Sequence, residues 1–153
     1  MNNQINLVES LNTSQILVGL DLGTKTLGVA VSDRYKIIAS PLSTIQRNGT
    51  KKDLLKLQEI LNDYEIGGFI VGLPLSLDNS ENQQTQLVRN FNKELIDFFS
   101  LPSVFWDERF SSDVIFKEMR RSNMSKNKIK NKLDQQSASY ILQGYLERYR
   151  KNK

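Results

Sequence analysis

The strongest constraint on the fold is a pair of apolar segments that only a few residues separate. Ile16 to Leu22 is a nearly continuous apolar run, which predicts a buried strand. Gly23-Thr24-Lys25 then predicts a turn, and Thr26 to Ser32 predicts a second strand. Because the connection is too short for a helix, we expect an antiparallel hairpin. A third strand predicted over Ile37 to Leu42, ended by the proline it contains, extends the hairpin to a meander.

After the meander the sequence alternates between helical and strand patterns. Ser80 and Gln83 fit a capping box, and Gly67-Gly68 separates a helix from the strand after it. The expected helices cover Asp53–Tyr64, Ser80–Phe99, Ser111–Arg121 and Asp134–Tyr149, and the expected strands cover Phe69–Leu73 and Val104–Trp106. A meander continued by crossover units predicts an α/β fold with a mixed five-stranded sheet flanked by helices.

The length of 153 residues fits one domain. The polar start predicts a flexible lead-in over residues 1–14, followed by a single domain over residues 15–150. The N-terminus lacks the basic and apolar pattern of a signal peptide, and no stretch approaches the roughly 20 apolar residues of a membrane span. We therefore expect a cytoplasmic protein without a membrane partner. The sequence carries no sign of its oligomeric state.

Two residue types are missing, and their absence limits the chemistry. The chain contains no cysteine and no histidine. This excludes disulfides, thiolate nucleophiles, imidazole acid–base catalysis and metal sites built on either residue. An enzyme of this composition works with carboxylates, lysine, tyrosine, serine or a cofactor. Clustered carboxylates favour hard cations such as Mg²⁺ or Mn²⁺.

Asp21 is the first candidate for a carboxylate site. It lies at the end of the first predicted strand, where the preceding apolar residues indicate burial. A buried carboxylate is costly unless it is paired or bound to a metal. Gly19, two residues earlier on the same strand face, would leave space beside the carboxylate. The structural alternative is that Asp21 only caps the hairpin turn.

Two further acids occupy positions that suit the same site. Glu108 follows the last predicted strand, and ligands of α/β sheets collect at strand ends. Asp134 lies near the edge of the apolar stripe of the final helix, which directs it towards the protein. Glu108 could instead belong to a solvated turn, and Asp134 could be an ordinary helix N-cap.

Together, the three acids suit two divalent cations roughly 4 Å apart, which activate water and stabilise the leaving oxygen of a phosphodiester. A basic segment directly precedes Asp134 and contains no acid, although the net charge of the whole chain is only +4. Its positive residues are Arg120, Arg121, Lys126, Lys128, Lys130 and Lys132. Such residues hold phosphates for an enzyme that cuts a polyanion. A solvated, mobile loop is the alternative.

The chain resembles the YqgF family in four motifs that follow in the same order. They are VGLDLGTKTLGVAVSD, VGLPLSLDNSENQQTQ, WDERFSS and DQQSASYILQGYLE, and the resemblance covers about Ile16 to Leu146. That family comprises nucleases for the 5′ end of precursor small-subunit ribosomal RNA, and its members are also regarded as similar to Holliday junction resolvases.

The resemblance implies an RNase H-like fold and a role in ribosome biogenesis. It implies that Asp21, Glu108 and Asp134 are catalytic acids that bind Mg²⁺ or Mn²⁺. It also implies that Lys25 contacts phosphate and that Arg109 orients Glu108 or contacts phosphate.

The chain departs from the family motifs at a few positions. Ser137 replaces a usual alanine, and Asn79 replaces a usual glycine after Asp78. Neither change is expected to touch the three acids. A fourth carboxylate is not evident, since Asn131 lies one turn before Asp134. Asp33 belongs to the first motif without a defined role.

The sequence thus predicts a metal-dependent nuclease that processes the 5′ end of pre-16S rRNA and binds structured RNA. Two alternatives remain open: a Holliday-junction-type resolvase acting on branched DNA, and a non-catalytic nucleic-acid-binding module. A phosphotransferase or ATPase is disfavoured, because such enzymes clamp a nucleotide between two domains of this kind and 153 residues hold only one.

Overall fold

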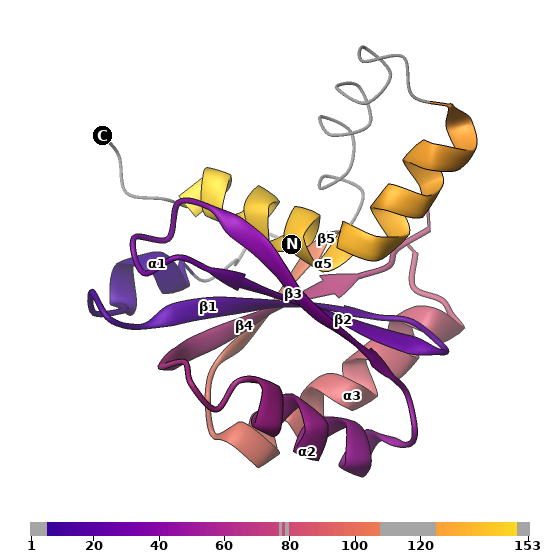
Figure 1. The fold of residues 1–153 in the computed structure, drawn as a ribbon. Helices are drawn as coiled ribbons and strands as arrows, with labels where there is room; N and C mark the ends of the chain where they lie inside the picture. Colours follow the sequence, from indigo (N-terminus) through magenta and orange to yellow (C-terminus); the bar gives the residue numbers. More distant parts are fainter. Residues whose placement is uncertain (1–5, 77, 79, 108–124, 150–153) are drawn as a thin grey trace.

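A five-stranded mixed sheet forms the centre of the computed structural model, which describes residues 6–76, 78, 80–107 and 125–149 (Figure 1). The strands are β1 (Ile16–Leu22), β2 (Thr26–Ser32), β3 (Ala39–Gln46), β4 (Ile66–Leu73) and β5 (Ser103–Asp107). They lie in the order β3-β2-β1-β4-β5. β2 is antiparallel to β1 and β3, whereas β4 is parallel to β1 and β5. The predicted α/β fold, with an antiparallel meander followed by parallel strands, is confirmed.

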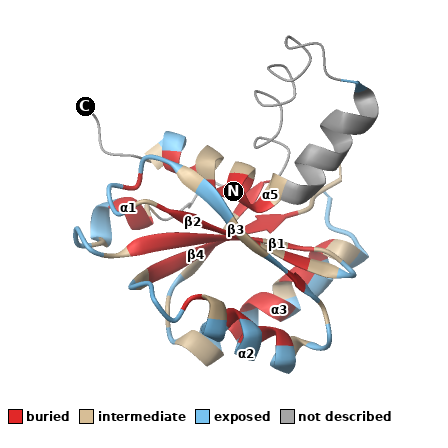
Figure 2. Ribbon diagram, in the orientation of Figure 1, coloured by how far each residue is buried: buried red, intermediate tan, exposed pale blue. Residues whose placement is uncertain are grey.

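Helices cover both faces of the sheet. α2 (Thr50–Ile60) and α3 (Gln83–Phe99) pack on one face, and α5 (Lys126–Tyr149) crosses the other together with the short α1 (Leu7–Ser10) (Figure 1). The strands between these layers carry most of the buried residues (Figure 2). The molecule therefore has two apolar cores, one on each side of the sheet.

Strand β1 contributes side chains to both cores. Val18 and Leu20 lie in the core under α2 and α3, and Leu17 lies in the core under α5. Successive strand residues point to opposite faces. Asp21, four residues after Leu17, therefore points to the face that α5 covers.

The carboxyl ends of β1, β4 and β5 lie side by side, because these three strands are parallel. They form one edge of the sheet, perpendicular to the strands. Leu20 of β1 pairs with Val71 of β4, and Leu73 of β4 pairs with Asp107 of β5. The turn between β1 and β2 lies at the same edge, since β2 returns antiparallel. This is the edge at which ligands of α/β sheets collect.

The third strand is longer than the sequence pattern predicts. It continues past Pro41 to Gln46, whereas we expected the proline to end it. β3 is an edge strand, and a proline at an edge does not interrupt the hydrogen-bonded ladder. The register between β2 and β3 also shifts next to this proline, between Val29 and Ala30.

The sequence suggested that the glycine pair Gly67-Gly68 separates a helix from the next strand. The pair instead lies inside β4. A Cβ atom on Gly67 would lie 2.4 Å from the Leu11 side chain, and one on Gly68 would lie 2.9 Å from that of Leu7. The two glycines therefore allow the N-terminal segment to pack directly on the start of β4.

The cap of α3 differs from the predicted one. Asn82, not Ser80, is the N-cap: its side chain accepts from the Thr85 amide, and the Thr85 hydroxyl accepts from the Asn82 amide. Thr85 also donates to the carbonyl of Pro74 and so fixes the loop after β4. The predicted capping box is present, but it begins two residues later than predicted.

The lead-in differs from the expected flexible segment where the structure describes it. Residues Leu7–Ser10 form α1, in which Leu7 and Val8 are buried. The Leu7 amide donates a hydrogen bond of 2.8 Å to the hydroxyl of Tyr145 in α5. Apolar burial and this buried hydrogen bond attach the segment to the core under α5.

Helix α5 begins at Lys126, eight residues earlier than predicted. Asp134 therefore lies within the helix, which contradicts the N-cap alternative. Residues 126–132 of the basic segment are helical, so the expectation of a loop is wrong for that part. The predicted helix Ser111–Arg121 lies outside the described residues. None of the helices in the described part of the chain is long and apolar enough to cross a membrane.

Replacing Tyr145 with phenylalanine is expected to lower the free energy of unfolding by about 1–3 kcal/mol, because the buried Leu7 amide loses its acceptor. Burial raises the pKa of Tyr145 to about 12. Since the pKa of an unfolded tyrosine is about 10, the parent should also lose stability as the pH rises from about 10 to 12, because the buried phenolate is poorly solvated in the folded state.

Urea unfolding at pH 7 and between pH 10 and 12 measures both effects. Tyr35→Phe is the matched control, since Tyr35 is exposed. Equal stability of Tyr145→Phe and the parent at pH 7 would contradict the assignment.

Candidate active site

Asp21 is half-buried at the end of β1, and its carboxylate is tied to α5. The Ser137 hydroxyl donates a short hydrogen bond to Oδ2 of Asp21. Among the residues described, Oδ1 of Asp21 accepts no hydrogen bond, and no lysine or arginine forms an ion pair with the carboxylate. The hairpin turn is instead closed by the backbone, through a hydrogen bond of 2.8 Å from the Gly23 amide to the Thr26 carbonyl. Among the residues described, the Asp21 carboxylate accepts no hydrogen bond from this turn, so the turn-cap alternative has no support there.

Ser137 is a site residue that the sequence reasoning missed. Its exchange for the usual alanine was expected to leave the three acids untouched, and that expectation is wrong, because the hydroxyl contacts Asp21 directly. No signal in the sequence alone shows this contact, since it depends on where α5 crosses β1.

A glycine of the neighbouring strand β2 lies beside Asp21. Gly28 of β2 is its register partner, and Gly72 of β4 follows Val71, the partner of Leu20. A Cβ atom on Gly28 would lie 3.7 Å from that of Asp21. The absence of a side chain at Gly28 reduces crowding around the carboxylate. Counting back from the hairpin turn could have identified Gly28 as the partner of Asp21.

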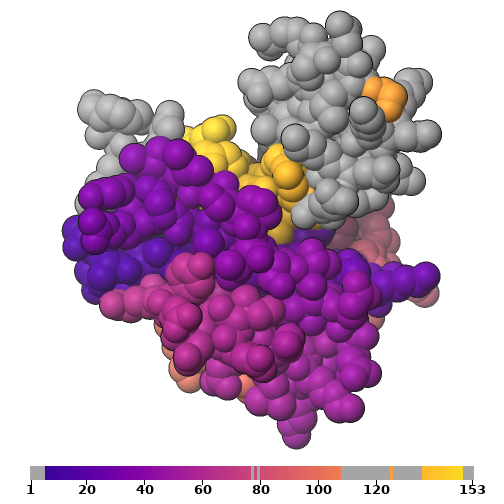
Figure 3. Space-filling model, in the orientation of Figure 1, coloured from indigo at the N-terminus to yellow at the C-terminus, as the bar shows by residue number. Residues whose placement is uncertain are grey.

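Gly19 has a different role from the one expected. A Cβ atom at Gly19 would lie 2.7 Å from Cβ of Leu142 and 2.8 Å from the carbonyl oxygen of Ala138. Helix α5 therefore fills the space that we expected to remain beside Asp21. The glycine allows the helix backbone to approach β1 closely, and this approach brings Ser137 to Asp21. In Figure 3 the orange and yellow part of α5 lies directly behind the purple surface of the front strands.

Two side chains support the backbone around Asp21. Gln84, in the first turn of α3, donates to the carbonyl of Leu22 over 3.1 Å. Arg47 donates to the Gly23 carbonyl over 3.4 Å, and its own amide donates to the Lys25 carbonyl. Lys25 itself is exposed on this turn. Its contact with phosphate stays a prediction.

The loop after β4 carries the acid Asp78, which is exposed. Hydrogen bonds from Ser80 lower the pKa of Asp78, so this acid stays ionised near neutrality. Its carboxylate organises the loop next to the capped start of α3.

The structure does not describe the side chains of the other two predicted acids. Glu108 lies outside the described residues and follows Asp107, the last residue of β5, in the sequence. Asp134 is in α5, three residues before Ser137, but its side chain lies outside the described part. No cluster of three acids that could hold a metal occurs within the residues whose side chains are described.

The remaining predicted contacts to nucleic acid also lie outside the described residues or side chains. Arg109, Arg120 and Arg121 belong to the first group. The second group consists of four lysines of α5, whose backbone alone is described: Lys126, Lys128, Lys130 and Lys132.

Asp33 lies at the opposite edge of the sheet from Asp21, because it follows the end of β2. Its Oδ1 accepts hydrogen bonds from the amides of Ile37 and Ile38 at 2.7 and 2.9 Å. These bonds hold the turn between β2 and β3. Asp33 is therefore a structural residue and not part of the candidate site.

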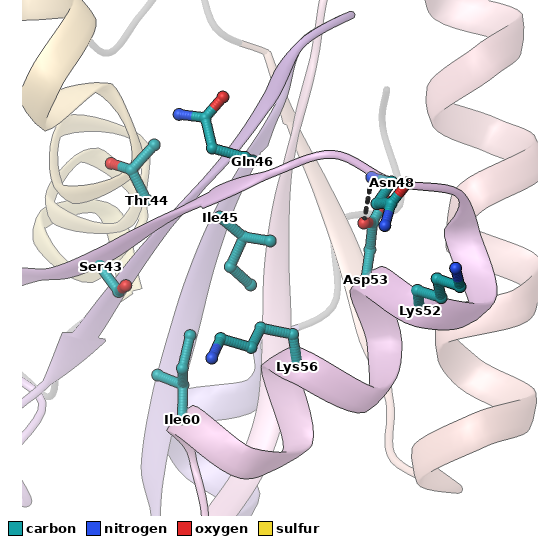
Figure 4. A pocket seen from close by; sticks show the side chains of 9 residues that line it. All are labelled: Ser43, Thr44, Ile45, Gln46, Asn48, Lys52, Asp53, Lys56 and Ile60. Carbon is teal, nitrogen blue, oxygen red and sulfur yellow. Dashed lines mark hydrogen bonds between the residues drawn. The ribbon is translucent and has the colours of Figure 1, made fainter.

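A pocket of about 460 Å³ lies between β3 and α2, where Ile45 and Ile60 form its apolar part and Lys52 and Lys56 its rim (Figure 4). Ile45 belongs to the core under α2 and α3. The pocket is therefore on the face of the sheet opposite to Asp21 and has no carboxylate available for a metal: Asp53, which also lines it, is paired with Arg47.

The sequence profile described as "RuvX: Holliday junction resolvase" matches residues 15–148. The chain belongs to this family. The RuvX family is the YqgF family that the motifs indicated, so the resemblance is confirmed. The chain is 42% identical over 137 residues to a protein of Methylocella silvestris named "Putative pre-16S rRNA nuclease", covering 90% of this chain and 85% of the relative. A protein of the same name from Rhodobacter capsulatus is 42% identical over 132 residues, covering 86% and 83%.

Solved structures confirm the RNase H-like fold of this RuvX member. RuvC of Thermus thermophilus superposes with a TM-score of 0.53 and 11% identity, covering 89% of this chain and 98% of RuvC. RuvC of T. thermophilus in complex with a Holliday junction substrate gives a TM-score of 0.52 and 10% identity, covering 88% and 95%. At this identity the likeness establishes the fold alone.

Replacing Gly19 with alanine is expected to destabilise the protein by about 1–3 kcal/mol, because the new methyl group overlaps the backbone of α5. Urea unfolding measures the loss. Gly28→Ala is the control, since its Cβ atom would meet Ala138 at 3.4 Å and Asp21 at 3.7 Å. Equal losses in the two variants would contradict the close approach of α5 at Gly19.

Proposed function

We propose that this protein is a metal-dependent nuclease that hydrolyses phosphodiester bonds, with Asp21, Glu108 and Asp134 as its catalytic acids. The observation that carries the proposal is the position of Asp21, at the ligand-binding edge of an RNase H-like sheet and in contact with α5. Membership of the RuvX family supports a hydrolytic role for this edge.

Chain geometry supports the convergence of the three acids. β4 alone separates β1 from β5, so the two strands lie about 9.5 Å apart. Glu108 directly follows β5, and ends of parallel strands share one edge. Asp134 precedes Ser137 by three residues, a rise of about 4.5 Å, and residues at this spacing are neighbours on a helix. Because Ser137 contacts Asp21, the backbone of α5 at Asp134 passes close to the site.

The donor set at Asp21 suits Mg²⁺ or Mn²⁺. These cations prefer oxygen ligands, and Oδ1 of Asp21 accepts no hydrogen bond from the residues described. Gly28, the register partner of Asp21, adds no side chain beside the carboxylate. Glu108 and Asp134 would complete the ligands. When bound, the cations supply activation of water and stabilisation of the leaving oxygen.

Residues of the chain orient the Asp21 carboxylate and bind the substrate. Asp21, fixed by Ser137, holds its oxygens at a constant position relative to the sheet. Lys25, on the exposed turn braced by Arg47, is available to bind a phosphate of the substrate. The lysines of α5 and the arginines before it would hold the strand further from the cleaved bond.

We propose structured RNA as the substrate, in the processing of the 5′ end of pre-16S rRNA in the cytoplasm. The support is the name shared by relatives that are 42% identical over most of the chain. Branched DNA is the second candidate, because the family is described by its Holliday junction resolvases and the fold is that of RuvC. A resolvase that cuts two strands would act as a symmetric dimer.

A cleavage assay tests the proposal with a precursor small-subunit rRNA and a four-way DNA junction in parallel. The parent is expected to cleave the RNA with Mg²⁺ or Mn²⁺ and to be inactive in EDTA. Asp21→Asn should lower the rate at least 100-fold, because it removes a negative ligand oxygen. Asp97→Asn is the control, since Asp97 is an exposed acid of α3 on the other face of the sheet.

Cleavage that persists in EDTA, or an Asp21→Asn variant of full activity, would rule out the metal-dependent mechanism. Faster cleavage of the junction than of the RNA would favour the resolvase. Binding of either substrate without cleavage, retained in Asp21→Asn, would identify a non-catalytic binding module.

A further inference from the structure

The contact between Ser137 and Asp21 joins α5 to the proposed active edge of the sheet. Ser137 is half-buried, and its hydroxyl donates to Oδ2 of the carboxylate. The next residue, Ala138, is buried, and its carbonyl lies where a side chain of residue 19 would be. The position of the hydroxyl is therefore set by tight packing of the helix backbone.

A serine within a helix usually has another hydrogen-bond acceptor available. Its hydroxyl can donate to a backbone carbonyl of the preceding turn, as Ser139 does to the Gln136 carbonyl over 2.7 Å. Ser137 instead reaches across to the neighbouring strand. Two serines on the same helix, two residues apart, thus use their hydroxyls in different ways.

We propose that Ser137 is a positioning residue for the divalent cation: it fixes the Asp21 carboxylate and directs Oδ1 towards the cation. This inference rests on the proposed nuclease function and deepens it. The carboxyl torsion of an aspartate is broad, so an unrestrained Asp21 samples many orientations. A hydrogen bond from a hydroxyl to a carboxylate is short and strong, and it selects one of them.

The hydroxyl restrains the carboxylate without blocking it. An ionised carboxylate has about four lone-pair sites on its two oxygens, and Ser137 occupies one of them. Oδ1 accepts no hydrogen bond from any residue described, so a cation has an oxygen available. Partners that orient a metal ligand typically contribute 10- to 100-fold to metal affinity or activity.

The test is Mn²⁺ binding to the full chain without nucleic acid, measured by calorimetry and by the electron paramagnetic resonance of free Mn²⁺. Ser137→Ala should weaken Mn²⁺ binding about tenfold, because the carboxylate loses its restraint. Ser137→Thr retains the hydroxyl and should recover most of the affinity. Ser139→Ala removes a hydroxyl of the same helix that does not face Asp21 and should leave the affinity within twofold of the parent.

The melting temperature of each variant separates positioning from a purely structural role. A Ser137→Ala variant with a lower melting temperature but parental Mn²⁺ affinity would overturn the inference. So would loss of affinity in Ser137→Thr as large as in Ser137→Ala.

Asp21→Asn separates failure of the inference from failure of the proposed function. If Asp21→Asn loses Mn²⁺ binding while Ser137→Ala keeps it, only the positioning role fails. If Asp21→Asn binds Mn²⁺ as the parent does, the proposed metal site fails as well.

Discussion

The close approach of α5 to β1 is the constraint on which the rest of the site depends. It requires glycine at position 19, because the Ala138 carbonyl and the Leu142 side chain occupy the space of a side chain there. The small pair Gly28 and Ala138 extends the contact to β2. Without this approach, Ser137 would not reach Asp21, and the helix that carries Asp134 would stand further from the sheet. The packing of α5 on β1 and the proposed metal site therefore depend on the same few residues.

Three acids of the described part show how surroundings distinguish structural from functional carboxylates. Asp53 is buried, forms an ion pair with Arg47 at 2.9 Å and accepts the Asn48 amide. Asp33 accepts two backbone amides within its turn. From the residues described, Asp21 accepts a hydrogen bond only from the Ser137 hydroxyl, although it lies at the edge where ligands of such sheets bind. Its remaining acceptor capacity, more than its burial, is what makes Asp21 the candidate metal ligand among these three acids.

The sequence predicted the elements better than their ends. Apolar runs and turn lengths were sufficient for the existence of the five strands and for the antiparallel meander, because these depend on local patterns. The extension of β3 past Pro41 and the docking of α1 depend on tertiary contacts that no local pattern contains. Asp21 was a candidate from its place at the end of a strand, with a turn cap as the alternative. Ser137 was not, because its role depends on a crossing between segments 116 residues apart.

The central claim is that Asp21, Glu108 and Asp134 share bound cations. Anomalous diffraction from crystals soaked in Mn²⁺ tests it most directly, since the peak locates the metal independently of activity. The account predicts at least one peak within about 2.5 Å of oxygens from all three acids, beside the Ser137 contact. A peak elsewhere on the molecule, or one that Asp21 does not touch, would contradict it.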